Sequence, residues 1–386
     1  MPHERRGSEG FFSVARGTDG RWWLLDPAGS RVFLRAVHEV SAPLPQSDGA
    51  RVLEPAGRLR AWGFNALGVG GDDVAVSGGL PYVGGVDFCA VGPVLTGPRL
   101  RLPDVFAPDW PRVAAQWALE RCRPEAGEAA LVGWVTDDLL AWAQPEDGWS
   151  GPTLLQLCLS LEPSLAAYHA AWEFVLALHG GRLDALARAW NFPLPNKESM
   201  RELTRAGRGI ATRGYARDEV QWTRECARRY FAGAANAVRA ADPSHLLLGP
   251  RHAGFAGPVV LAEASYPLVD LALLPWQELG AVARPGLQPA LADNVGWVSP
   301  AFRAPGGARE RGLTSVERML RRARLALTRL ALHPSVVGYA WARWRDLPSE
   351  KPPFGSGLVH QDEAEAIEHT ELLSEFNQRL AQLRDS

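Results

Sequence analysis

The stretch Gly133-Trp134-Val135-Thr136-Asp137-Asp138-Leu139-Leu140-Ala141-Trp142 places two carboxylates directly after a short apolar run. The run Ala130–Thr136 has the length and composition of a buried strand, and the pair Asp137-Asp138 follows its carboxyl end. In parallel α/β barrels, active sites form at the carboxyl ends of the strands. The stretch therefore predicts a strand that brings acidic side chains to the functional face of a barrel.

Further apolar runs of this kind alternate with helical stretches along the 386 residues. They are Val32–Val40, Phe64–Val69, Tyr82–Phe88, His245–Gly249, Val269–Leu274, Pro289–Val295 and Val336–Trp344. Strands that alternate with helices pair in parallel, and eight such units close a (β/α)8 barrel. We therefore predict a TIM barrel of the α/β class, built as a single domain over residues 11–386.

Two additions to this barrel are expected. Residues 11–26 form a predicted antiparallel hairpin, and residues 1–10 before it are expected to be a flexible N-terminus. The long separation of the fourth and fifth strands predicts an insertion at about residues 143–217. Residues 152–179 and 183–190 of that segment have helical patterns. Residues 191–214, with two prolines and several basic residues, are expected to form a surface loop.

Charge and composition exclude several classes of protein. The formal net charge is −2, from 41 basic and 43 acidic residues, so no global field draws the chain to nucleic acid or to an anionic membrane. Residues 1–10 are charged, and no stretch reaches about 18 apolar residues, so we expect a cytoplasmic protein. The four cysteines form no C-x-x-C pair, and metal, serine-hydrolase and nucleotide motifs are absent from the sequence. We therefore expect no metal and no cofactor.

Motifs distributed over nearly the whole chain occur in one order. They are Phe12–Val40, Ala61–Asn65, Asp104–Pro108, Gly133–Trp142, Ala241–Gly249 and His333–Pro348. This ordered set resembles agarase-like members of the clan A glycoside hydrolases. The resemblance implies a barrel that recognises a carbohydrate and carries two catalytic glutamates at its strand ends.

The fourth-strand motif departs from the family at its general acid/base. In the matching register, Asp137 corresponds to the family's Asp, and Asp138 falls where the family has Asn. Leu139 then occupies the position of the acid/base glutamate. Leucine cannot carry a proton, so the resemblance implies that the usual acid is missing.

The seventh-strand motif departs at the nucleophile. The family pattern of Pro, a few small or apolar residues and Glu aligns with the segment from Pro289 to Val295. Asn294 then stands at the nucleophile position, and Asp293 lies one residue before it. A neutral amide is a poor nucleophile, so the usual covalent route is also expected to be absent.

Three functional hypotheses remain open. Retaining hydrolysis needs two carboxyl groups about 5 Å apart, and general acid–base catalysis contributes about 10²–10⁴-fold. The leading hypothesis is a degenerate glycosidase-like barrel that binds a carbohydrate or a similar neutral ligand. The rival is an active β-glycosidase that uses Asp137 or Asp138 with Asp293, for which an inverting spacing of about 6.5–9.5 Å would tolerate the shorter side chains. The third is a scaffold barrel that binds a protein partner.

Several side chains near predicted strand ends are candidates for ligand contact. They are His38, Arg251, Trp276, Asn294, Trp297 and Trp341. Each also has a structural interpretation: the histidine as a satisfied core residue, the tryptophans as packing, and Arg251 as the partner of an aspartate at the strand ends. Asp137 and Asp138 also have a structural interpretation, as caps of a helix beginning at Leu139.

Overall fold

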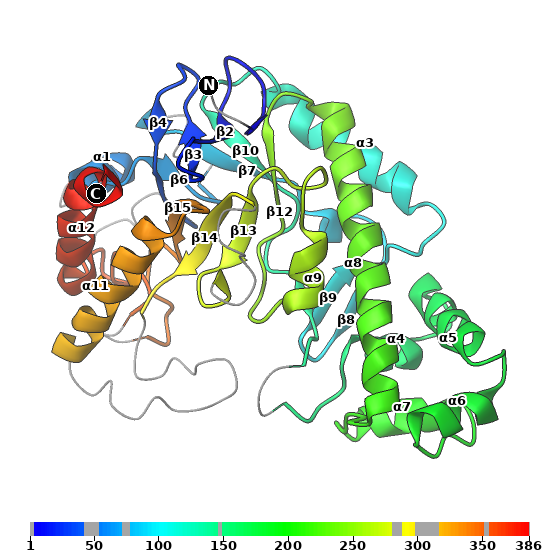
Figure 1. The fold of residues 1–386 in the computed structure, drawn as a ribbon. Coiled ribbons are helices and arrows are strands. Elements are labelled where there is room, and N and C mark those ends of the chain that lie inside the picture. Colours follow the sequence, from blue (N-terminus) through cyan, green and yellow to red (C-terminus); the bar gives the residue numbers. More distant parts are fainter. Residues whose placement is uncertain are drawn as a thin grey trace.

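The fold is centred on an eight-stranded parallel sheet that closes nearly into a barrel (Figure 1). The computed structural model describes residues 4–41, 54–71, 78–145, 149–279, 288–297, 316–350 and 355–385. The sheet order is β12-β10-β7-β6-β5-β15-β14-β13. The two end strands also meet, because the N–H groups of Asp270 and Leu271 both donate to the carbonyl of Leu247. The predicted α/β barrel is therefore confirmed.

Each barrel strand coincides with, or overlaps, one of the predicted apolar runs. The strands are β5 (Leu34–Val37), β6 (Ala66–Leu67), β7 (Tyr82–Gly85), β10 (Leu131–Val135), β12 (Leu246–Gly249), β13 (Ala272–Pro275), β14 (Ala290–Val295) and β15 (Val336–Trp341). Side chains alternate between the barrel interior and the surrounding helices. On β5, Leu34 and Ala36 point into the interior cluster, and on β12 Leu246 and Leu248 do so.

Gly133 permits the close approach of β10 and β12. A Cβ atom at this position would lie 2.3 Å from the carbonyl oxygen of Leu246, a distance that no real side chain tolerates. Glycine is therefore required by the packing of the two backbones. This contact fixes β10, which leads to Asp137 and Asp138, against β12, which leads to Arg251.

An antiparallel sheet closes the amino-terminal end of the barrel. Its strands are β1 (Glu4–Arg6), β2 (Ser13–Arg16), β3 (Trp22–Leu25) and β4 (Arg31–Val32), and β2 with β3 forms a hairpin. The side chains of Phe12, Val14, Trp22 and Leu24 join the same buried cluster as the barrel interior. The sheet therefore seals the end of the barrel opposite the predicted site.

Within the N-terminal segment 1–10, which is expected to be flexible, Glu4–Arg6 pair with β2; residues 1–3 lie outside the described residues. Arg6 is buried, and its guanidinium donates to the carbonyl of Asp270 at 3.1 Å. It also lies over the rings of Trp22 and Tyr266. These contacts tie the N-terminal strand to the barrel, although its sequence has no apolar pattern.

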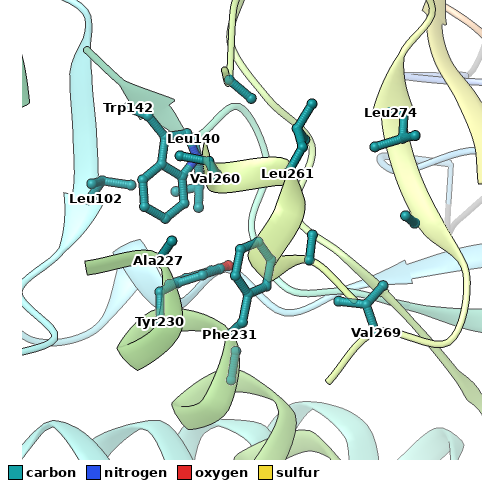
Figure 2. Packing of buried hydrophobic residues seen from close by; sticks show 14 of the residues in the cluster. Leu102, Leu140, Trp142, Ala227, Tyr230, Phe231, Val260, Leu261, Val269 and Leu274 are labelled. Carbon is teal, nitrogen blue, oxygen red and sulfur yellow. The ribbon is translucent and has the colours of Figure 1, made fainter. Parts of the chain in front are cut away.

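Helices cover the outside of the barrel. They include α1 (Pro55–Ala61), α3 (Trp110–Cys122), α8 (Arg213–Ala241), α9 (Pro258–Glu263), α11 (Val316–Leu332) and α12 (Ile367–Asp385), with short 3₁₀ turns at Phe88–Ala90 and Arg123–Glu125. Figure 2 shows Tyr230 and Phe231 of α8 near Trp142 and Val260. The rings of Trp142 and Tyr230 meet edge to face at 5.7 Å. Among the described helices, none is both long enough and apolar enough to cross a membrane.

The elaboration around the fourth unit is a helical lobe with a small sheet at its base (Figure 1). The antiparallel strands are β8 (Val94–Gly97), β9 (Leu100–Pro103) and β11 (Ala141–Trp142), and the helices are α4 (Leu154–Ser160), α5 (Ala166–Leu178), α6 (Leu183–Trp190) and α7 (Glu198–Arg205). The loop expected at residues 191–214 instead contains α7 and the start of α8. Met200 explains the difference, because it is fully buried and, with the partly buried Leu203, anchors this mainly polar helix to the lobe.

Candidate functional site

Arg251 connects the carboxyl ends of β10 and β14 at the open end of the barrel, here called the barrel mouth. It lies just beyond β12 and is 1% exposed. Its Nη1 donates to Asp138 Oδ1 at 2.7 Å, and its Nη2 donates to Asn294 Oδ1 at 2.8 Å. Its Nε lies 3.5 Å from Asp293 Oδ1. The structural interpretation of Arg251, as the partner of an aspartate at the strand ends, is confirmed.

The backbone holds Arg251 in this position. Its N–H donates to the carbonyl of Asp137 at 2.9 Å, and its carbonyl accepts from the N–H of Leu140. The chain after β10 therefore continues to pair with the chain after β12, and a bridge forms between Leu140 and His252. This pairing, rather than a helix, follows the two aspartates, so the predicted helix beginning at Leu139 is wrong.

His38 and Asp293 form a buried pair beside Arg251. The imidazole Nδ1 of His38 accepts from the N–H of Val69 at 3.0 Å, so its Nε2 carries the proton and donates to Asp293 Oδ1 at 2.8 Å. Burial and the charge of Arg251 lower the pKa of His38, which keeps the ring neutral. Burial opposes ionisation of Asp293, but Arg251 and His38 outweigh it, so the pKa of Asp293 is lowered and the group is a carboxylate.

Three side chains of the site reach solvent, two of them polar and one apolar. The side chain of Asp138 is 36% exposed, Leu139 is 42% exposed and Asn294 is half-buried. Leu139 and Asn294 both adopt left-handed backbone conformations, with φ of 58° and 53°. This conformation is costly for leucine, whereas asparagine adopts it more readily. The two positions that the resemblance assigns to the glutamates thus both reach solvent, and the backbone strain falls on Leu139.

Asp137 points away from this group. It is 1% exposed; its Oδ1 accepts from the N–H of Cys89 at 2.9 Å, and its Oδ2 accepts from the hydroxyl of Tyr230 at 2.6 Å. Burial, and then the neighbouring Asp87, raise the pKa of Asp137 well above its usual range. The carboxyl group is consequently held by helix α8 and the turn after β7. Sequence reasoning gave no signal for Asp87 or Tyr230, because both contacts are tertiary.

Asp87, Cys89 and Asp137 bring three potential metal ligands within 4.8 Å of one another. Their oxygens are already used: Asp87 pairs with Arg101 at 3.0 Å, and both aspartates accept from the N–H of Cys89. Burial and Asp137 also raise the pKa of the Cys89 thiol, which disfavours the thiolate that a metal requires. The guanidinium of Arg101 supplies the positive charge beside Asp87. Asp87, Cys89, Asp137 and Arg101 therefore form a structural network.

The predicted aromatic residues form one packed group and one separate ring. Trp341 is fully buried; its Nε1 donates to the carbonyl of Ser356, and its ring meets Trp297 edge to face at 4.7 Å. Trp297 is also buried and donates to His369. Trp276 is half-buried, and its backbone N–H donates to the carbonyl of Asp293 at 3.1 Å. Stacking of a sugar on any of these three tryptophans stays a prediction.

The comparisons with known proteins find a likeness in structure. No family model matches the sequence, and no curated protein matches it. Two solved structures, an exo-β-agarase and a second agarase, match with TM-scores of 0.70 and 0.69 at 15% identity, over 99% of this chain and 66% of each of theirs. The chain has the fold of the agarases. It spans just under two thirds of the length of these two agarases.

A more distant match extends the likeness to another group of barrel enzymes. A β-galactosidase from the psychrophilic Marinomonas ef1 matches with a TM-score of 0.52 at 13% identity, over 91% of this chain and 60% of its own. At such low identities these structural matches show the fold alone, and the chemistry has to be argued from the residues at the barrel mouth.

Proposed function

We propose that this agarase-like barrel binds a neutral carbohydrate at its mouth and does not hydrolyse it. The observation that carries the proposal is the arrangement around Arg251. At the two positions where the resemblance implies catalytic glutamates, the chain has an exposed aliphatic side chain, Leu139, and an amide, Asn294, that accepts a hydrogen bond from Arg251. Leu139, at the position of the acid, therefore cannot donate a proton, and Asn294, at the position of the nucleophile, carries no negative charge.

The remaining carboxyl groups supply poor substitutes. Glycoside hydrolysis needs one group that is protonated and aimed at the leaving oxygen. Asp293 is held as a carboxylate by Arg251 and His38, so it lacks the proton. Asp137 has a raised pKa, but its oxygens are engaged by Cys89 and Tyr230 in the interior. Neither group combines the protonation state and the position that an acid requires.

The rival hypothesis, an active β-glycosidase, now has one candidate pair of catalytic carboxyl groups. Asp138 and Asp293 both contact the guanidinium of Arg251, which brings two carboxyl groups to the same part of the barrel mouth. Asp138 would then have to act as the acid, although its Oδ1 already accepts from a permanently charged guanidinium. The observation favours Asp138 over Asp137 as the partner of Asp293 if any turnover is found.

A panel of aryl β-glycosides and agar-derived oligosaccharides tests the proposal. Sugar release and ligand-induced melting shifts should be read together, for the native chain and for Asp137→Ala, Asp138→Ala and Asp293→Ala. We expect a stabilising shift without release of sugar. Release that is abolished by Asp138→Ala or Asp293→Ala would overturn the proposal and establish the rival hypothesis.

The third hypothesis, a scaffold for a protein partner, predicts no response to any sugar. A hollow of about 440 Å³ between α11 and α12 offers it a surface. Its lining includes Leu320, Ile367 and Leu372 with several glutamates. The absence of both sugar release and a melting shift across the whole panel would favour this hypothesis. The cytoplasmic location stays a prediction under all three hypotheses.

A further inference from the structure

Arg251 fixes the orientation of the two polar side chains that reach the barrel mouth. A guanidinium presents its N–H donors in a rigid planar fork, and here one arm holds Asp138 Oδ1 and the other holds Asn294 Oδ1. The fork cannot swing away, because Arg251 is 1% exposed and its backbone pairs with Asp137 and Leu140. The two side chains are therefore held side by side by a common, immobile support.

This arrangement leaves one acceptor and one donor free. Within the described part of the chain, Asp138 Oδ2 and Asn294 Nδ2 have no hydrogen-bond partner, and both residues are partly exposed. Since Asn294 Oδ1 faces Arg251, the NH₂ group of the same amide must face away from it. Arg251 thus determines that the mouth presents a carboxylate oxygen next to an amide NH₂.

We propose that Asp138 and Asn294 together bind two neighbouring hydroxyl groups of an uncharged sugar, with Arg251 as the positioning residue. The inference rests on the proposed function and specifies the class of ligand. A hydroxyl group both donates and accepts, so one hydroxyl donates to Asp138 Oδ2 while its neighbour accepts from Asn294 Nδ2. Leu139 directly follows Asp138 in the sequence, and its exposed side chain supplies apolar surface for sugar C–H groups.

The charges at the mouth favour an uncharged ligand over an acidic one. Asp138 and Asp293 are two acidic groups around one guanidinium, and His38 is neutral, so the group carries excess negative charge. Glu39, which follows β5 on the rim, adds another carboxylate, with Arg343 3.9 Å from it. The buried guanidinium of Arg251 has no exposed surface with which to receive an anion. The exposed cations nearby already have acidic partners: Arg101, which donates to the carbonyl of Asp138, pairs with Asp87, and Arg343 lies beside Glu39. A sugar carboxylate at Asp138 would therefore have to compete with these carboxylates for a cation.

Exchange of Asp138 for Asn tests the assignment directly. The amide oxygen of Asp138→Asn can still accept from Arg251, which leaves a second NH₂ group at the mouth and removes one negative charge. Affinity should be measured by ligand-observed NMR for an agar hexasaccharide and for the pair methyl β-galactoside and methyl β-galacturonoside. We expect the neutral sugars to bind about tenfold more weakly to the variant and the galacturonoside to bind more tightly than before.

Glu39→Gln is the matched control, because it removes a rim carboxylate without touching the fork. It should leave the affinity for the neutral sugars unchanged. Arg251→Lys keeps the positive charge but loses the two-armed support, and it should weaken the neutral sugars as much as Asp138→Asn does. Arg251→Lys can also lower the stability of the fold, so the test of the sugar-binding role relies on Asp138→Asn. The melting temperature of Asp138→Asn shows whether this variant is folded.

The outcomes separate the two proposals. If no sugar binds to the native chain, the proposed function fails, and this inference fails with it. If neutral sugars bind but the galacturonoside binds equally well, or if Asp138→Asn and Glu39→Gln have the same effect, carbohydrate binding stands and the assignment of Asp138 and Asn294 is overturned.

Discussion

Leu139 combines an exposed aliphatic side chain with a left-handed backbone at the position where agarase-like enzymes are expected to have their acid. Its φ of 58° is costly for a residue with a Cβ atom, by about 1–2 kcal/mol. Nothing in the immediate packing requires a leucine there, since 42% of the residue is exposed. If Leu139 contacts the sugar as proposed, this strain serves binding rather than stability.

Leu139→Gly should therefore stabilise the protein by up to about 1 kcal/mol, because glycine adopts this conformation without a steric cost. The free energy of unfolding in urea measures the effect, and sugar affinity should fall in parallel. Leu119→Gly is the control, because Leu119 is similarly exposed but lies within helix α3. It should destabilise by about 1 kcal/mol. Destabilisation by both substitutions would show that Leu139 is not strained.

Individual site residues could be predicted from sequence only in part. The motif register brought Asp138, Asn294 and Arg251 to notice, and the structure places all three in one group. The sequence could not separate Asp137 from Asp138, because their different surroundings depend on Tyr230 and Arg251, which are distant in the chain. The helix predicted at Leu139 failed because pairing with the chain after β12 overrides the local capping signal.

At the scale of elements, the barrel strands were predictable because buried parallel strands are short, apolar and separated by helical patterns. The strand β1 was not, since Glu4–Arg6 is charged throughout and gains its contacts from distant residues. Helix α7 was missed for a similar reason: its sequence is mainly polar and charged and follows two prolines, and its one fully buried residue, Met200, makes no periodic pattern.

The N-terminal strand makes a testable contribution to stability through Arg6. Arg6→Ala removes a buried hydrogen bond to the carbonyl of Asp270 and the stacking on Trp22, and it should destabilise the protein by about 1–3 kcal/mol in urea unfolding. Arg5→Ala is the neighbouring control, because Arg5 is exposed, and it should change stability by less than about 0.5 kcal/mol. Equal effects of the two substitutions would contradict the assigned role of β1.

At the scale of the whole molecule, several buried neutral histidines make folding sensitive to acid. Burial lowers the pKa of His38, His252 and His369, in the case of His252 to about 4. The unfolded chain takes up protons at a pH near 6.5, where the folded chain does not. The stability that these groups contribute is complete above about pH 6.5 and is lost as the pH falls toward their folded pKa values.

The melting temperature should therefore fall between pH 7 and pH 5, and His252→Gln should reduce that fall. Its Nδ1 accepts from the indole N–H of Trp142, a role that a glutamine oxygen can also fill. Protonation linked to His252 alone destabilises by about 2 kcal/mol at pH 5. His169→Gln, at an exposed histidine, should leave the pH dependence unchanged. If the melting temperature has the same pH dependence in the native protein and in His252→Gln, buried neutral His252 is not a source of the acid sensitivity.

The measurement that tests the central claim most directly is titration of the native protein with an agar hexasaccharide in a calorimeter, followed by chromatography of the recovered sugar. A barrel that binds through Asp138 and Asn294 without an acid at Leu139 predicts saturable heat and an intact hexasaccharide. Shortened products whose formation is lost in Asp138→Asn would contradict the account and identify the protein as a working glycosidase.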